Sequence, residues 1–332
     1  MRISVLGAGG WGTALSIILN SNGHSVTLWE YKKSYAKTLN KSRINKSYLP
    51  GITIPKEITI THSLDEACEK QHMIVLAVPS QFLRSVIKQL KKYDFKDTTF
   101  VSVAKGIETG TLFTVSQMIH DELPNVDENK IGVLSGPSHA EEVAKKVPTA
   151  VVAASKDEET SKEIQSAFMT SFFRVYSSTD ILGVELGGAL KNVMAIGAGI
   201  IDGANFGDNT KAAIMTRGIA EISRIGTALG AKPETFAGLS GMGDLIVTCM
   251  SRHSRNRFVG EQIGKGKKLK DVLKSMQMVA EGVETCRSAY ELAVKNHIDA
   301  PIINAAYNIL YNDKDPIKAT YELMTREMKS EH

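Results

Sequence analysis

The sequence predicts two domains of different class: a doubly wound α/β domain over residues 1–180 and an all-helical domain over residues 181–332. Three observations support this division. The chain has 332 residues, a length that suits two domains better than one. Its first half alternates short apolar runs with amphipathic segments, the pattern of a mostly parallel sheet covered by helices on both faces. Beyond Thr179 only segments with helical spacing remain.

The apolar runs of the first half are short and rich in β-branched residues, as buried parallel strands are. The first, ISVLGAG, leads directly into glycines. The segment after it, WGTALSIILNSNG, has helical spacing and ends on Gly23, a suitable C-terminal cap. The further runs expected to be strands are SVTLWE, MIVLAVP, TFVSVAKG, IGVLSG, TAVVAAS and FRVYSS, the last of which ends near Ser178.

The second half is expected to contain helices only. Its segments with helical spacing are ILGVELGGALKNVMAIGAGIIDG, NTKAAIMTRGIAEISRIGTALG, RFVGEQIG, KDVLKSM, ETCRSAYELAVKN and INAAYNILY. The longest apolar run, VMAIGAGII, falls far short of the ~20 residues that cross a membrane, so no membrane-embedded segment is expected.

Composition narrows the functional classes. The net charge of +4, from 40 basic and 36 acidic residues, is too small for a general nucleic-acid binder. The three cysteines, Cys68, Cys249 and Cys286, form no CxxC pair, which favours free thiols in a reducing compartment and no metal site. The N-terminus lacks the apolar core and cleavage site of a signal peptide. A cytoplasmic location is therefore expected.

Residues 7–12 read Gly-Ala-Gly-Gly-Trp-Gly, a G-x-G-x-x-G motif between a strand and a helix. Gly7 allows a tight turn, Gly9 lets the backbone approach a pyrophosphate, and Gly12 lets the helix pack on the strand. The helix N-terminus then offers N–H groups and a positive dipole end to phosphates. An ordinary glycine turn is the alternative, but the strand–turn–helix context favours a Rossmann-type dinucleotide site.

The residues at the end of the second strand do not decide between NAD and NADP. Glu30 lies where an acidic residue would hold the ribose 2′-hydroxyl of NAD. Tyr31, Lys32 and Lys33 follow at once, and the two lysines could neutralise the 2′-phosphate of NADP or could simply be solvated.

Two lysines are candidates for the proton donor that hydride transfer to a carbonyl requires. Lys105, in SVAKGIE, ends a strand at the sheet edge where ligands collect. Lys191, in ELGGALKNVMAIGAGI, is surrounded by small residues in a helix, and its burial would lower its pKa toward the range useful for acid–base catalysis. The alternative is that either one is an ordinary surface lysine.

Two further segments combine turns with polar residues. In LSGPSHAEEV, Ser138 can cap a helix, and Glu141 can complete a capping box. In the stretch from Leu239 to Gly260, Asp244 could orient a lysine, accept a hydrogen bond from a substrate hydroxyl, or cap a helix.

The same stretch contains SRHSRNR, in which Ser254, Arg255 and Asn256 form a compact set of donors. A guanidinium suits a phosphate because it forms paired, charge-assisted hydrogen bonds. The cluster is too small for a nucleic-acid groove and has no interleaved aromatic platform. We therefore expect one arginine to bind a single phosphate, with the others solvated.

Together these motifs resemble the NAD(P)-dependent glycerol-3-phosphate dehydrogenases of the bacterial biosynthetic type. The motifs that carry the resemblance are GAGGWGTAL, SVAKGIE, LSGPSHAEEV, GVELGGALKN, SGMGDLIVTCMSRHSRNR and AEGVET, which span residues 1 to about 325. The resemblance implies reversible reduction of dihydroxyacetone phosphate to sn-glycerol 3-phosphate, for glycerophospholipid synthesis. It also implies NADPH or NADH as coenzyme, with a lean toward NADPH, and a homodimer.

The resemblance also implies roles for individual residues. The catalytic residues would be Lys191 as proton donor and acceptor, Lys105 and Asp244. Residues implied at the cofactor are Gly7, Gly9, Gly10, Trp11, Gly12, Tyr31, Lys32, Lys105, Ala140, Arg255, Val279 and Glu281. Residues implied at the substrate are Lys105, Gly136, Ser138, Lys191, Asp244, Ser254, Arg255 and Asn256. Family members often carry His or Arg at the position of Tyr31, which leaves the NADP preference open.

Three other functions compete with this one. A β-hydroxyacid or 6-phosphogluconate dehydrogenase would share the two domains and the helix lysine followed by Asn, but not SRHSRNR. A non-catalytic dinucleotide sensor would need the glycine-rich site without Lys191. A nucleic-acid-binding protein would lose affinity steeply with salt.

Overall fold

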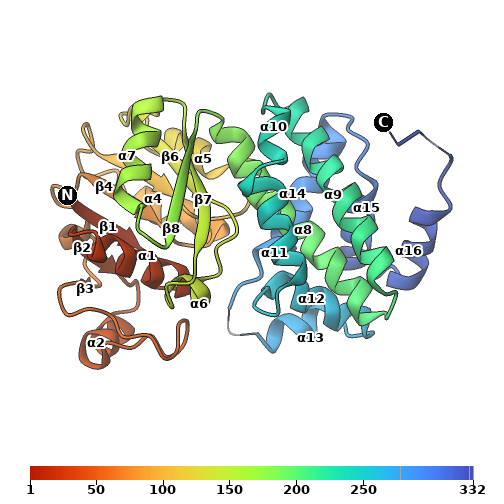
Figure 1. Ribbon diagram of the computed structural model, residues 1–332, viewed down its shortest axis with the longest axis horizontal. Helices are drawn as coiled ribbons and strands as arrows, with labels where there is room; N and C mark the ends of the chain where they lie inside the picture. Colours follow the sequence, from red (N-terminus) through yellow and green to blue (C-terminus); the bar gives the residue numbers. More distant parts are fainter. Residues whose placement is uncertain (277, 329, 332) are drawn as a thin grey trace.

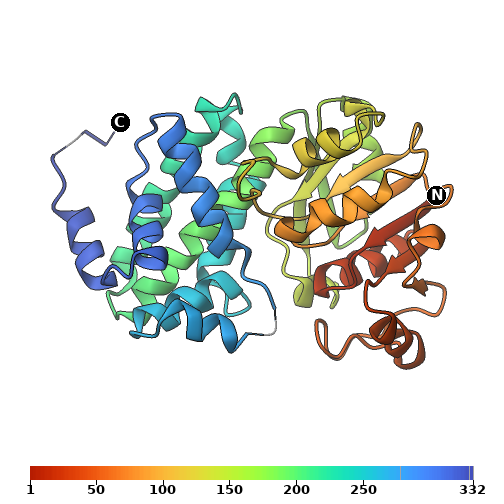
Figure 2. The same cartoon turned by 180° about the vertical axis from the view of Figure 1, so that it is seen from behind.

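The structure is a computed structural model that describes residues 1–276, 278–328 and 330–331. An α/β body formed by the N-terminal half lies beside a helical body formed by the C-terminal half (Figure 1). The reverse view shows the same two bodies, with the chain ends at opposite ends of the long axis (Figure 2).

The α/β body is built on one eight-stranded sheet in the order β3-β2-β1-β4-β5-β6-β7-β8. The strands are β1 Arg2–Leu6, β2 Ser25–Trp29, β3 Thr59–Thr61, β4 Met73–Leu76, β5 Thr99–Ser102, β6 Ile131–Ser135, β7 Thr149–Ser155 and β8 Phe173–Ser178. All neighbouring strands are parallel except β6 and β7. The mostly parallel sheet expected from the sequence is therefore confirmed. Its order reverses at β1, which opens a ligand crevice at the carboxyl ends of β1 and β4.

Seven of the eight strands coincide with the apolar runs of the sequence, and β3 does not. β3 has three residues, two of them threonines, and lies at one edge of the sheet. It is held by parallel pairing with β2 from Thr27 to Trp29, which a local sequence pattern cannot reveal.

Helices cover both faces of the sheet. They are α1 Gly10–Ser21, α2 Lys33–Ser42, α3 Leu64–Cys68, α4 Ser80–Leu90, α5 Val115–Glu122, α6 Ala140–Val143 and α7 Glu158–Phe168. Two separate apolar clusters follow the alternation of strand side chains. In β4, Met73 and Val75 join the cluster that packs against α1 and α7, whereas Ile74 and Leu76 join the cluster against α4 and α5.

The helical body is organised around α8 Ile181–Gly203, which is buried along nearly its whole length. Around it lie α9 Asp208–Ala228, α10 Pro233–Phe236, α11 Asp244–Met250, α12 Arg255–Gly264, α13 Leu269–Lys274, α14 Glu281–Lys295, α15 Pro301–Tyr311 and α16 Pro316–Met324. Within the described residues, α8 is the one helix long and apolar enough to cross a membrane, and all of its apolar window is buried inside the protein. It is therefore the core helix of this body.

Glycines allow α8 and α12 to pack in backbone contact. A Cβ added to Gly199 would lie 2.0 Å from the carbonyl oxygen of Arg257, and one added to Gly260 would lie 1.9 Å from that of Ile196. Any larger residue would push the helices apart. This packing fixes the N-terminus of α12, which carries the SRHSRNR donors, against the helix that carries Lys191.

Candidate active site

Two lysines and an aspartate form a buried ionic cluster where the two bodies meet. Asp244 Oδ1 accepts a hydrogen bond from Lys191 Nζ at 3.0 Å, and Asp244 Oδ2 accepts one from Lys105 Nζ at 2.7 Å. Lys105 also donates to the carbonyl oxygen of Gly136 at 2.9 Å, and Lys191 to Thr248 Oγ1 at 2.6 Å. The sheet edge after β5 and β6 and two helices of the other body thus meet at one carboxylate.

Small residues let these elements approach. A Cβ added to Gly187 would lie 2.9 Å from the carbonyl oxygen of Ser240, in the π-helical segment Leu239–Gly243 that leads into α11. Next to Lys191, the Asn192 amide donates to the carbonyl oxygen of Lys105 at 2.9 Å. The glycines and the asparagine around Lys191 therefore bring the two lysines to the same aspartate.

Burial and pairing act on the proton affinities of this cluster. Burial lowers the pKa of Lys191 to about 8, because desolvation of the ammonium and the like charge of Lys105 outweigh the attraction of Asp244. Burial by itself would raise the pKa of Asp244, but the adjacent ammonium groups of Lys105 and Lys191 outweigh it and hold that pKa below its ordinary value. The cluster thus joins a permanent carboxylate to a lysine able to give and take a proton near neutral pH.

The glycine-rich turn has the form that a dinucleotide requires. Gly7 has φ +120°, and a Cβ there would lie 2.6 Å from the carbonyl oxygen of Ala77. Gly12 lies equally tightly on the turn, whereas the space beside Gly9 is open. The turn runs into the N-terminus of α1, whose N-cap Gly9 has no side-chain cap hydrogen bond. A pyrophosphate fits at this helix N-terminus.

Residues from both bodies frame this crevice. Ala140 begins α6. A Cβ added to Gly10 would lie 3.7 Å from the Cβ of Ala140. From the helical body, Glu281 Oε1 accepts a hydrogen bond from the backbone N–H of Ser80, which begins α4 after β4. Val279 precedes Glu281 by two residues, and its side chain is exposed. The AEGVET segment is thereby tied to the sheet edge where a nicotinamide coenzyme would lie.

Unsatisfied polar atoms gather in the same region. Among the described residues, six buried side-chain polar atoms have no hydrogen-bond partner: Trp11 Nε1, Gln71 Oε1, Ser80 Oγ, Ser135 Oγ, His139 Nε2 and Thr285 Oγ1. All but Gln71 belong to the glycine-rich motif, to the carboxyl end of β6, to the N-termini of α4 and α6, or to α14. Buried polar groups without a partner are rare in folded proteins, and this concentration is what a ligand-binding crevice would contain.

After β2, Glu30 differs in burial from the two residues that follow it. The Glu30 side chain is buried, and its Oε1 accepts a hydrogen bond from the backbone N–H of Lys32 at 2.9 Å. Tyr31 and Lys32 are exposed, with Lys32 Nζ 5.3 Å from the centroid of the Tyr31 ring. Glu30 thus supports its own turn, whereas Tyr31 and Lys32 are open to solvent.

The SRHSRNR cluster divides into structural and accessible residues. Ser254 caps α12 by accepting from the backbone N–H of Arg257, and Asn256 Oδ1 accepts from the backbone N–H of Gly282 at 3.0 Å. Arg257 is not solvated, contrary to expectation, because its guanidinium pairs with Asp202 at 2.6 Å. Unlike Arg257, Arg255 is exposed at the start of α12, so its guanidinium is accessible to a phosphate.

The expected capping box at Ser138 is wrong. Ser138 Oγ donates back to the carbonyl oxygen of Gly136 at 2.9 Å, and His139 is the N-cap of α6, without a side-chain cap hydrogen bond. Gly136 has φ +141° and packs against Val151, so the tight turn, and not a helix cap, decides the Ser138 conformation.

Three residues beside the predicted ones were not found from the sequence: Thr248, Ser80 and His139. Thr248 could have been found, because it follows Asp244 by four residues and so lies on the same helix face. His139 could also have been found, because it lies between Ser138 and Ala140 in the LSGPSHAEEV motif. Ser80 carries no local signal, since its hydrogen bond to Glu281 joins residues 201 positions apart.

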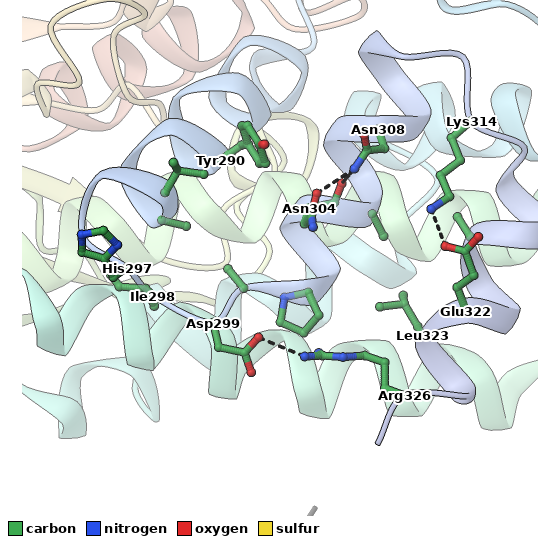
Figure 3. A pocket seen from close by; sticks show the side chains of 16 residues that line it. Tyr290, His297, Ile298, Asp299, Asn304, Asn308, Lys314, Glu322, Leu323 and Arg326 are labelled. Carbon is green, nitrogen blue, oxygen red and sulfur yellow. Dashed lines mark hydrogen bonds and ion pairs between the residues drawn. The ribbon is translucent and has the colours of Figure 1, made fainter. Parts of the chain in front are cut away.

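A separate cavity lies far from this cluster in the helical body. It has a volume of about 520 Å³ between α14, α15 and α16. Its charged groups are paired with one another, Lys314 with Glu322 and Arg326 with Asp299 (Figure 3). None of the residues predicted for cofactor or substrate lines it.

Comparisons with known proteins show which family this chain is similar to. Residues 2–161 match the family described as NAD-dependent glycerol-3-phosphate dehydrogenase N-terminus, and residues 180–321 match the C-terminus of the same family. The chain is 51% identical over 331 residues to a glycerol-3-phosphate dehydrogenase (NAD(P)+) of Chlorobium phaeobacteroides (strain BS1), covering 100% of this chain and 99% of that protein.

Two further relatives extend the likeness. A protein with the same name from Thermoanaerobacter sp. (strain X514) is 52% identical over 331 residues, with 100% of this chain and 99% of that protein covered. The crystal structure of glycerol-3-phosphate dehydrogenase from Coxiella burnetii superposes with a TM-score of 0.93 at 36% identity, over 98% of this chain and 99% of that chain. The chain therefore belongs to the NAD-dependent glycerol-3-phosphate dehydrogenase family.

Proposed function

We propose that this protein reduces dihydroxyacetone phosphate to sn-glycerol 3-phosphate, reversibly, with NADPH or NADH. The observation that carries the proposal is the Lys191–Asp244–Lys105 cluster, which lies at the sheet edge of a chain of this family. The product would supply glycerophospholipid synthesis.

The lysine cluster accounts for the proton and the charge of the reaction. The reduced nicotinamide supplies the hydride. Lys191, protonated at neutral pH, faces the carbonyl oxygen, stabilises the negative charge that develops there and delivers its proton to it. Asp244 keeps both ammonium groups in place. Lys105 also donates a hydrogen bond to the carbonyl oxygen of Gly136, in the turn that would contact the substrate. In the reverse direction neutral Lys191 accepts the hydroxyl proton.

The substrate phosphate would be anchored away from the carbonyl. Arg255 at the start of α12 supplies a charge-assisted donor, with Ser254 and Asn256 holding that start in place. Gly136 and Ser138 would contact the substrate from the opposite body. Binding energy from this remote phosphate would orient the reacting carbon and raise the rate beyond what the carbonyl contacts alone allow.

The cofactor would lie over the glycine-rich turn, along Gly7, Gly9, Gly10, Trp11 and Gly12. Tyr31, Lys32, Ala140, Arg255, Val279 and Glu281 would complete the residues that hold it. The open space beside Gly9 and the tie between Glu281 and the N-terminus of α4 support this placement.

We propose a preference for NADPH, because Glu30 is buried in a hydrogen bond to its own turn while Lys32 is exposed. Lys32→Ala is expected to raise the KM for NADPH about three- to fivefold and to leave that for NADH unchanged, since one exposed charge contact is lost. Initial rates with each coenzyme measure this. Lys41→Ala, at the other end of α2, is the matched control; an equal effect on both coenzymes would contradict the preference.

The pH dependence of the two directions should be opposite. The pKa of Lys191 in the folded protein is about 8, so the ammonium needed for reduction is lost as pH rises through that value. The kcat for reduction should therefore fall above pH about 8, while the kcat for oxidation rises over the same range. Profiles from pH 6 to 10 in both directions test this. Inflections in the same sense for both directions would rule Lys191 out as the proton donor.

We further propose a cytoplasmic homodimer divided into domains at residues 180 and 181. The three cysteines are free and buried, which suits a reducing compartment. Separate apolar cores for the sheet and for α8 support the domain division. Light scattering coupled to size exclusion would give the mass, and a mass near 36.1 kDa would exclude the dimer.

Nicotinamide absorbance with purified protein and dihydroxyacetone phosphate tests the reaction itself. Oxidation of NADPH or NADH is expected with this substrate and not with β-hydroxyacids or 6-phosphogluconate. Bound coenzyme without turnover of any of them would instead favour a dinucleotide sensor.

A further inference from the structure

His139 is a histidine at the active-site crevice to which neither the family motifs nor the mechanism above gives a role. Its backbone begins α6, where its carbonyl oxygen accepts from the backbone N–H groups of Glu142 and Val143. Its side chain makes no cap hydrogen bond, and its Nε2 atom is buried without a partner in the described part of the chain. Fold stability therefore does not explain this polar atom, because burying it unpaired costs free energy.

The ring contacts the SRHSRNR segment and is within electrostatic reach of the reacting cluster. Its centroid is 5.8 Å from that of His253, in the turn that precedes Ser254 and α12. The charges of Lys191, Lys105 and Asp244 all act on it. His139 comes from the sheet body and His253 from the helical body, so this ring contact joins the two bodies.

The charge state of His139 suits a donor to an anion. Burial, and then the ammonium groups of Lys191 on α8 and Lys105 after β5, lower its pKa, against the weaker opposing effects of Glu141 on α6 and Asp244 on α11. His139 is therefore neutral near pH 7. A neutral imidazole with its proton on Nε2 donates one hydrogen bond without adding a third positive charge beside the two lysines.

We propose that His139 Nε2 donates a hydrogen bond to the phosphate of the three-carbon substrate and so helps select phosphorylated substrates; this deepens the proposed function and rests on it. The carbonyl end of such a substrate lies at Lys191. A three-carbon chain then carries its phosphate toward the start of α12, and His139 is on that side, next to His253. The coenzyme also has phosphates, and Ala140 lies near Gly10, so the test must separate the two sources.

The test compares His139→Phe with His139→Gln in the full-length protein. Phenylalanine keeps a ring against His253 but removes the donor, whereas the Gln amide nitrogen can occupy the position of Nε2. For His139→Phe we expect the KM for dihydroxyacetone phosphate and the inhibition constant of inorganic phosphate to rise together, about tenfold or more, as for one lost hydrogen bond to a charged group. The kcat and the KM for NADPH should change less than about twofold, and His139→Gln should recover most of the loss.

Several outcomes would overturn the inference. They are an unchanged phosphate inhibition constant in His139→Phe, a Gln variant no better than Phe, or a loss confined to the KM for NADPH, which would assign His139 to the coenzyme. His120→Phe changes an exposed histidine on α5 that is paired with Glu128, and it controls for general effects of the substitution. If the wild-type protein does not turn over dihydroxyacetone phosphate, the proposed function fails; if it does and His139→Phe equals it, only this inference fails.

Discussion

Lys191→Met is expected to lower the kcat for reduction of dihydroxyacetone phosphate by about 10²- to 10⁴-fold, the usual contribution of a positioned general acid. The KM should change little, because Lys105 and the phosphate contacts remain. Methionine keeps the length and apolar stem of lysine within the packed core of α8, so the loss would be chemical.

The same change is expected to raise the melting temperature. The pKa of Lys191 is lower in the folded protein than in the unfolded chain, so below pH about 8 the buried ammonium costs folding free energy. Removing it relieves that cost, and Asp244 keeps Lys105 as its partner. Calorimetry and steady-state kinetics on one preparation test both effects.

Lys211→Met is the matched control for this experiment. Lys211 is another largely buried lysine of the helical body and is paired with a carboxylate, Asp202, at 2.8 Å. Its replacement should leave kcat near the wild-type value. Equal losses in both variants, or a folded Lys191→Met protein with wild-type kcat, would remove Lys191 from the reaction.

Asp244→Asn is expected to have the largest effect on stability, lowering the free energy of unfolding by about 3–5 kcal/mol at neutral pH. The change keeps the shape but leaves the ammonium groups of Lys105 and Lys191 close together without their shared counterion. Urea unfolding measures it. The cost should shrink as pH rises toward 8, because without Asp244 the pKa of Lys191 is lower and its proton is lost at a lower pH than in the wild-type protein.

A double-mutant cycle separates this charge effect from lost packing. Adding Lys105→Met to Asp244→Asn removes one of the two unpaired charges, so the double variant should be more stable than Asp244→Asn alone. Additive losses would mean that Asp244 acts through its shape and not through its charge.

The sequence indicated the sheet because each central strand is a short apolar run that is buried on both faces. It could not indicate β3, because three residues with two threonines carry no such signal and are ordered by pairing with β2. The same reasoning applies to the helices. The length and apolar content of Ile181–Gly203 predict α8, whereas the sequence analysis predicts no helix over Pro316–Met324, which forms α16.

At the site, the motifs already indicate which residues have suitable chemistry: the glycine turn, the two lysines, and the aspartate and arginine of the second half. Which groups these residues pair with depends on the fold. Asp244 pairs with both lysines, Arg257 pairs with Asp202, and Nε2 of His139 has no partner within the described part of the chain. These pairs join residues 53 to 139 positions apart in the chain and form only where the helices and the two bodies pack together, which no local pattern encodes.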